Sequence, residues 1–333
     1  MRRIIKVCLF LGTLWCLWWF GASAVLHASL ETWLETRRSE GWQAEASAVS
    51  GGGFPLTLVA NLENPRFADP GTGVAIAADS LRFEADAWWP GQARLLLPQT
   101  PIRLAAPDGR TEMTMQDGRL RLDLAPNTQL GLRQLSWLAG PWDISSPEGR
   151  RFSADNLTLS MMQGGDAERY LFDINMDAAR PGEVPRARLR IPEDWPLTFS
   201  SLQIKMDVLF DRPWDRRALE DRRPQPRHIN LQLAEAAWGD LRLKLAADLQ
   251  VSPAGEPTGE IRLQARNWQA MIDLAQGADL LPQNLRPQVT SIFQTLAGAT
   301  GNPETIDVTL QAQRGLLFFG FLPVGPAPIL QLR

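Results

Sequence analysis

The stretch that decides the fold is residues 227–265, RHINLQLAEAAWGDLRLKLAADLQVSPAGEPTGEIRLQA. Apolar and polar residues alternate along it, as where Leu243 and Leu245 flank Lys244. A period of two places the apolar side chains on one face of a strand and the polar ones on the other, which is typical of antiparallel sheet. A tight turn signal at residues 239–240 separates the first two runs. The segment therefore predicts a three-stranded antiparallel meander.

The same alternation recurs along most of the chain after residue 42. Further alternating runs occur at residues 81–86, 119–124, 157–161, 202–210 and 306–312. Applied to the whole chain, these rules predict about a dozen strands. An open sheet of that size must twist, curl or split. We therefore expect a large curved or split antiparallel sheet, in the form of a half-barrel or a β-groove.

Helical patterns are few and come late in the chain. Residues 267–276 and 285–297 each carry an apolar stripe at helical spacing and are followed by a glycine, and residues 214–221 could form a shorter helix. Two or three short helices that cluster near the end of a strand-rich chain indicate an α+β fold, mostly antiparallel β.

The N-terminal segment has the properties of a membrane anchor. Residues 7–26 contain no charge, which is the length needed to cross about 30 Å of hydrocarbon. Arg2, Arg3 and Lys6 precede this run and favour a cytoplasmic N-terminus. We therefore expect an inner-membrane protein with a single span. Residues 1–41 would form the anchor and a juxtamembrane helix, and residues 42–333 a periplasmic β-rich domain, with a subdivision near 211–227 left open.

A cleaved signal peptide is the alternative for this segment. Ala22-Ser23-Ala24 resembles a cleavage site, and cleavage near Ala24 would release the domain into the periplasm. Either interpretation exports the domain.

Composition argues against several classes of function. The net charge is −3, without the basic surplus of a nucleic-acid-binding protein. Cys8 and Cys16 are the only cysteines and lie in the apolar run, and His27 and His228 are the only histidines. A metal cluster and a nucleophilic triad both need more of these residues. We therefore expect no enzyme, no cofactor and no metal.

Tryptophan is unusually frequent, with 13 residues against one tyrosine. Core filling explains many of them, but aromatic rings can also line an apolar groove. The candidates for such a groove are Trp88, Trp89, Trp268 and Phe293.

The segment 211–227 is dense in charge. Arg216, Arg217, Arg222 and Arg223 are candidates for a surface that contacts another protein. They are interleaved with acids at positions 211, 215, 220 and 221, and charges that alternate at this spacing usually neutralise one another on a solvated surface.

The same segment carries a family resemblance. The sequences at 211–215 (DRPWD), 219–226 (LEDRRPQP) and 233–239 (LAEAAWG), with GFP at 53–55 and LPVGPAP at 322–328, resemble an alphaproteobacterial family of unknown function. The resemblance implies an N-terminal anchor and a periplasmic domain, and it brings no activity. The apolar run at 315–320 departs from the more polar strand usual there. The architecture is also similar to AsmA-like envelope proteins, in which a curved sheet forms an apolar groove associated with lipid movement.

These observations favour an envelope protein that binds an apolar ligand or handles lipid on a curved sheet, and that contacts the inner membrane through its N-terminal helix. The alternative is a periplasmic scaffold or adaptor for other envelope proteins. A more remote alternative is a hydrolase that uses carboxylates in residues 211–221.

Overall fold

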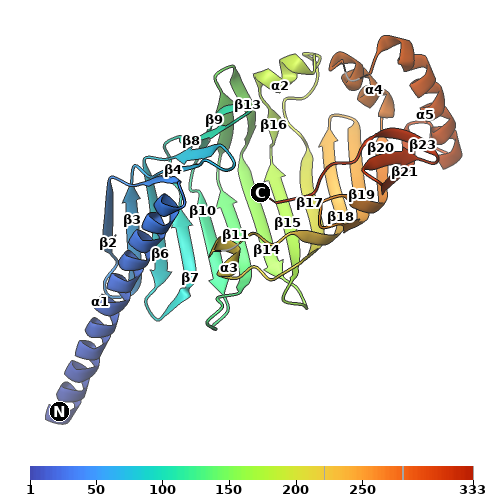
Figure 1. The fold of residues 1–333 in the computed structure, drawn as a ribbon. Coiled ribbons are helices and arrows are strands. Elements are labelled where there is room, and N and C mark those ends of the chain that lie inside the picture. The colour runs from blue at the N-terminus through green and yellow to red at the C-terminus, as the bar shows by residue number, and fades with distance from the viewer. Residues whose placement is uncertain (221, 280, 333) are drawn as a thin grey trace.

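The computed structural model describes residues 1–220, 222–279 and 281–332. The chain begins with one continuous helix, α1 (Arg2–Ser39), and continues as a β-rich domain (Figure 1). The helix therefore continues beyond the uncharged run as far as Ser39. This is the one described helix that is long and apolar enough to cross a membrane, a property that a signal sequence shares.

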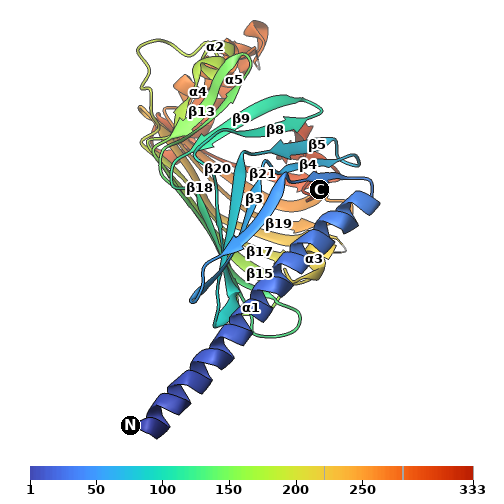
Figure 2. The same ribbon diagram turned by 90° about the vertical axis from the view of Figure 1, so that its left-hand side faces the viewer.

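The described residues form one large antiparallel sheet of fifteen strands. In sheet order its members are β2 (Ala48–Gly52), β3 (Thr57–Glu63), β6 (Ser80–Asp86), β7 (Trp89–Leu96), β10 (Arg119–Leu124), β11 (Leu132–Ala139), β14 (Asn156–Gln163), β15 (Arg169–Asp177), β17 (Ser201–Phe210), β18 (Pro226–Trp238), β19 (Leu241–Val251), β20 (Pro257–Arg266), β21 (Thr305–Gln313), β22 (Leu316–Phe319) and β23 (Leu322–Pro326). The sheet curves, and α1 runs beside its first strands (Figures 1 and 2).

A second sheet continues the first eight strands of the large one. Its members are β1 (Gln43–Glu45), β4 (Arg66–Asp69), β5 (Val74–Ala77), β8 (Ile102–Ala106), β9 (Gly109–Met115), β12 (Trp142–Ser146), β13 (Gly149–Ala154) and β16 (Arg180–Pro181). Their order follows the order of the large sheet, so that β3 leads into β4 and β5 into β6. The two sheets are therefore one set of long strands, bent at a common level.

The bend coincides with residues that interrupt a β-ladder. Pro65 and Pro141 lie at the bend and cannot donate a ladder hydrogen bond. Asn64, Asp117 and Ala178 have positive φ, which turns the backbone out of the extended conformation. The short strands beyond the bend lack a long alternating pattern, which explains why the sequence predicted only about a dozen strands.

The remaining elements are short helices: α2 (Glu183–Arg188), α3 (Arg217–Glu220), α4 (Trp268–Gly277), the 3₁₀ turn η1 (Gln283–Leu285) and α5 (Arg286–Thr300). The predictions for α4 and α5 are confirmed, although α5 ends at Gly301 instead of Gly298. Of the helix predicted at 214–221, the described residues form only the short α3, and residue 221 lies outside the described part. No sequence pattern predicted α2, which contains Pro185.

The predicted fold class is confirmed, and so is the meander of residues 227–265. Strands β18 and β19 are joined by a two-residue turn in which Gly239 has φ 58°. Strands β17 and β18 pair from Ser201 opposite Ala237 to Phe210 opposite Pro226. The large sheet is therefore continuous from β17 to β18, the two strands that the charged segment connects.

Candidate functional site

One face of the large sheet is apolar across almost its whole width. Directly opposed residues in an antiparallel ladder point to the same side, so the registers define rows of neighbouring side chains. The middle row is Ala60, Phe83, Leu95, Leu120, Trp137, Leu159, Ile174, Ile204, Ala234, Leu245, Leu263 and Val308. The lower row is Leu58, Ala85, Ala93, Leu122, Leu135, Met161, Phe172, Met206, Leu231, Ala247, Ile261 and Leu310. We call the face made by these two rows the trough.

The middle row of the trough is buried at its two ends and more accessible between them. In the middle row the end residues Ala60 and Val308 are 0% and 8% exposed, whereas every residue between them is half-buried. Neighbouring strands lie about 4.8 Å apart, so the row from β3 to β21 is about 50 Å long. A half-buried apolar surface of this length is unusual in a soluble domain, because full burial of such side chains would stabilise the fold.

The other face of the sheet carries charges. Pairs on this convex face include Arg82 with Glu84 (2.7 Å), Arg169 with Asp207 (2.9 Å) and His228 with Asp248 (2.6 Å). The alternation seen in the sequence therefore separates an apolar concave face from a polar convex face.

At the first end of the trough, α1 and the sheet enclose a cavity of about 720 Å³. Its walls are almost entirely apolar: Leu17, Trp18, Gly21, Ala22, Val25, Leu26, Ser29 and Leu30 from α1, Leu58, Phe83, Glu84, Ala85 and Ala93 from the sheet, and Leu130 from the β10–β11 loop. Four of the sheet residues belong to the trough rows. The cavity is therefore the α1 end of the trough.

Three tryptophans fasten α1 to this end. The indole N–H groups of Trp15, Trp18 and Trp19 donate to the carbonyl oxygens of Pro55, Ala87 and Thr57, at 3.0, 2.9 and 2.8 Å. The Trp19 ring is buried in a cluster with Leu58 and Ala87.

At the opposite end, α4 and α5 pack tightly on β20 and β21. Trp268 is 1% exposed, its indole N–H donates to the carbonyl of Pro303 at 3.0 Å, and its ring meets Phe293 edge-on at 5.7 Å. Ile272 and Ala297 are buried in the same cluster. This end of the trough is filled by the protein's own side chains.

The connection after β17 covers part of the lower edge of the trough. Trp214 packs edge-on against Phe210 at 5.6 Å. The Tyr170 hydroxyl donates to the Leu132 carbonyl at 3.0 Å and accepts from the Trp214 backbone N–H at 3.3 Å. Burial raises the pKa of Tyr170, so its hydroxyl stays protonated and can donate.

Three buried indole N–H groups have no hydrogen-bond partner among the described residues. They belong to Trp137, in the middle row, to Trp142 in the same core cluster, and to Trp214. A buried donor without a partner costs free energy. Trp137 is not among the groove candidates predicted from the sequence, because a lone tryptophan within an alternating strand resembles ordinary core.

The structure separates the four groove candidates predicted from the sequence. Trp268 and Phe293 are brought together, but in the packed core that closes the trough. Trp88 is 59% exposed at the β6–β7 hairpin, beside α1, and Trp89 follows it half-buried at the start of β7. The aromatic residues that do line the trough are Phe83, Trp137 and Phe172.

The charged segment is internally paired. Arg217 binds Asp215 at 2.8 Å, and Arg222 and Arg227 bind Asp211 at 2.7 and 3.3 Å. Arg216 and Arg223, the other two arginines proposed for a partner surface, are exposed, as are Arg217 and Arg222.

This pairing also bears on acid catalysis. The Arg217 side chain holds the pKa of Asp215 below its ordinary value. For Asp211, burial acts to raise the pKa, but hydrogen bonds from the Gln225 N–H and from Arg222 outweigh it and leave the pKa lowered. A general acid needs the opposite shift. The side chains at positions 220 and 221 lie outside the described part.

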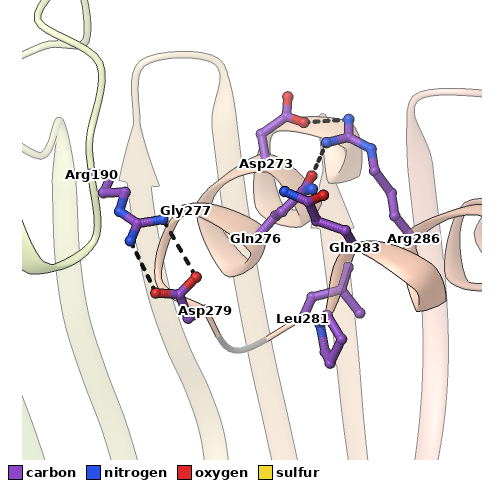
Figure 3. Close-up of a pocket in the computed structure, with 9 residues that line it drawn as sticks. Arg190, Asp273, Gln276, Gly277, Asp279, Leu281, Gln283 and Arg286 are labelled. Atoms are coloured by element: carbon purple, nitrogen blue, oxygen red, sulfur yellow. Dashed lines mark hydrogen bonds and ion pairs between the residues drawn. The ribbon is translucent and has the colours of Figure 1, made fainter.

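A second hollow, of about 400 Å³, lies beside α4 and the start of α5 and is polar (Figure 3). Arg190 pairs with Asp279 at 3.1 Å and Arg286 with Asp273 at 2.6 Å, all four side chains being exposed. Exposed pairs of this kind contribute about 0–1 kcal/mol and are ordinary surface features. Among the described residues, no group of three His, Cys, Asp or Glu could hold a metal ion.

Comparison with known protein families gives a match over residues 19–328 to a family described as "Uncharacterized protein conserved in bacteria (DUF2125)". No curated protein matches the chain. The matched region contains the whole trough and most of the α1 segment that packs on it.

Proposed function

We propose a non-enzymatic, lipid-handling function for this chain, which belongs to the DUF2125 family of bacterial proteins. The observation that carries the proposal is the trough, in which two rows of apolar side chains cross twelve strands without a polar residue, and the middle row stays half-buried between its buried ends. An acyl chain laid along them would remove this surface from water, at about 0.8 kcal/mol for each CH₂ group buried.

The length of the trough supports movement of lipid more than storage of one molecule. Its middle row extends for about 50 Å. One leaflet contributes only about half of a 30 Å hydrocarbon core, so an acyl chain is much shorter than the trough. Several chains, or one chain in successive positions, would fit along it.

We further propose that α1 is an uncleaved anchor in the inner membrane, with its N-terminus in the cytoplasm and the domain in the periplasm. The basic residues before the apolar run support this orientation. Cleavage near Ala24 would remove the three tryptophans that fasten α1 to the sheet. The intact mass of the protein isolated from membranes tests this point: a mass that begins after residue 24 would contradict the anchor.

Photo-crosslinking tests the lipid proposal directly. The full-length chain is made in cells labelled with ³²P-phosphate, with a photoreactive phenylalanine analogue at Leu120, Leu159 or Ile204 in the trough. Matched controls carry it at Leu138 or Leu171, which are 48% and 42% exposed on the convex face of neighbouring strands. We expect label to be transferred to phospholipid adducts from the three trough positions and not from the controls.

Equal labelling from both faces, or none from the trough, would overturn the proposal. A replacement that perturbs folding is recognised by circular dichroism and is exchanged for the next position along the row, such as Leu245.

An adaptor function has its own supporting observation. At the far edge of the sheet, Phe321, Val324 and Ile329 are 88%, 56% and 70% exposed, and β23 is an unpaired edge among the described strands. The photoreactive group at Phe321 would then give protein adducts. Such adducts together with unlabelled trough positions would favour the adaptor over the lipid-handling function.

A further inference from the structure

We infer that two hairpin tips of the β-domain are themselves inserted into the membrane, where they form a collar around α1 and place the α1 end of the trough at the bilayer. We use the name collar for the apolar patch made by Phe54 and Leu56 of the β2–β3 tip and Trp88 of the β6–β7 tip, together with the α1 segment 15–20 beside them. The inference rests on the proposed anchoring by α1. It adds that the β-domain itself also contacts the membrane.

The collar is an exposed apolar patch. Phe20, Phe54, Leu56 and Trp88 are 63%, 52%, 59% and 59% exposed. Phe54 stacks on Phe20 at 6.0 Å and meets Trp19 edge-on at 5.3 Å. The aromatic rings of the hairpin therefore continue the apolar surface of the helix without a break.

The length of α1 identifies the bilayer as the occupant of this patch. The first hydrogen bond between α1 and the domain is made by Trp15. Residues 2–14, on the N-terminal side of Trp15, form a helical segment only about 18 Å long. A hydrocarbon core of about 30 Å needs roughly eight more residues, so even a span that began at Arg2 would extend to about residue 22, and a span over the uncharged residues 7–26 extends further. A membrane that α1 crosses therefore reaches the level of the two hairpin tips.

The polar groups of the tips are suited to this position. Backbone carbonyl oxygens have no water to bind in hydrocarbon and need a partner within the protein. The carbonyls of Pro55, Thr57 and Ala87 receive theirs from the three α1 indoles. Asp86, at the end of β6, is paired with Arg94. Indole rings are also the side chains that favour the membrane interface.

The neighbouring tips on the same edge of the sheet differ. Residues 126–129 of the β10–β11 loop are exposed and include Asn127 and Gln129, and the β14–β15 loop exposes Gly165 and Asp166. Of these four tips, the two with exposed apolar side chains are the two that are hydrogen-bonded to α1. Figure 2 shows α1 extending beyond the sheet from this region.

Spin labelling of the full chain in vesicles of phosphatidylethanolamine and phosphatidylglycerol tests the inference. The native cysteines are changed to alanine (Cys8→Ala, Cys16→Ala). A single cysteine carrying a nitroxide then replaces Leu56 or Trp88, with Asp166 as the control in the neighbouring tip and Leu11 as the reference within α1. Oxygen concentrates in lipid and a nickel chelate stays in water, so the ratio of the two collision rates reports depth.

We expect the oxygen-to-nickel ratio at Leu56 and at Trp88 to be severalfold higher than at Asp166 and close to that at Leu11. Ratios at Leu56 and Trp88 as low as at Asp166, with Leu11 in lipid, would overturn the collar and leave the anchor intact. A low ratio at Leu11 as well would overturn the anchor on which the collar rests. All three test positions are exposed, so the labels do not enter a packed core.

Discussion

The two ends of the trough are built from similar materials and packed in different ways. At one end, the long helix α1 lies over β3, β6 and β7 and leaves a cavity of about 720 Å³. At the other end, α4 and α5 lie over β20 and β21, and Trp268 and Ala297 are 1% exposed. Both ends use a tryptophan indole that donates to a backbone carbonyl, Trp19 at the first and Trp268 at the second.

The difference lies in what the helices present to the sheet. Gly21, Ala22 and Ser29 face the α1 end, and these side chains are too small to fill the space above Ala85 and Ala93. The opposite end receives Trp268, Ile272 and Phe293, which fill it. An open cavity beside the long apolar helix α1 and a plug at the far end give the trough a direction. The predictions below test this asymmetry.

The largest effect is expected from Trp268→Ala. The change removes a fully buried ring and leaves a cavity, so the free energy of unfolding should fall by about 3–5 kcal/mol. Urea denaturation of the full chain in detergent, followed by circular dichroism, measures it. The control is Trp88→Ala at the exposed hairpin, where a change within about 0.5 kcal/mol is expected. Equal effects of the two substitutions would mean that the α4–α5 end is not a packed core.

The second prediction places the same side chain at each end. Ala297→Phe inserts a ring into the packed cluster and should cost about 1–3 kcal/mol. Ala93→Phe inserts one into the cavity beside α1, where space exists, and should leave stability within about 0.5 kcal/mol while lowering the amount of lipid that copurifies. Lipid is measured by organic extraction and phosphate assay. A large stability loss for Ala93→Phe would show that the cavity closes in solution.

The general form of this fold follows from the sequence because one physical pattern dominates it. Strict alternation in runs such as residues 241–251 fixes both the strand and the side that faces the trough, since a slip of one residue would expose every apolar side chain. The charge-free run of α1 is equally direct. The bend is harder to foresee, because Asp117-Gly118 is indistinguishable from an ordinary turn signal and positive φ at Ala178 leaves no local signal.

The site was predictable in kind but not in detail. The groove candidates predicted from the sequence are aromatic residues, and two of them, Trp268 and Phe293, lie in the plug at the end of the trough. The trough itself consists mainly of leucine, isoleucine and alanine. Which of these stay half-buried depends on what covers the sheet, and that is a property of the assembled fold. Membership of the uncharacterised family is confirmed, whereas the alphaproteobacterial source and the AsmA-like architecture stay predictions.

A third and smaller effect concerns the connection that borders the middle of the trough. Asp215 is buried, and its lowered pKa comes first from the Arg217 side chain. A carboxyl whose pKa is lowered by folding stabilises the protein above its unfolded pKa of about 3.9, and that contribution is lost as the pH falls through the folded value. Asp215→Asn should therefore cost about 1–2 kcal/mol at pH 7 and progressively less below pH 4.

Unfolding midpoints across this pH range measure the effect, with Asp279→Asn as the control. Asp279 pairs with Arg190 on the open surface, where the pair is worth about 0–1 kcal/mol (Figure 3). A cost for Asp215→Asn that stays constant down to acid pH would show that the carboxylate charge is not the stabilising feature.

The smallest effect is expected on the convex face. It sharpens the comparison of the two ends by testing whether lipid binds along the concave face that joins them. Leu138 and Leu120 lie on neighbouring strands but on opposite faces, because Leu120 is opposed to Trp137 and Leu138 to Arg119. Leu138→Ser should change stability by no more than about 0.5 kcal/mol and leave the copurified lipid unchanged. Leu120→Ser should reduce that lipid, because a hydroxyl would interrupt the middle row. If both substitutions reduced the lipid alike, binding would follow the overall hydrophobicity of the sheet, and the different packing of its two ends would carry no direction.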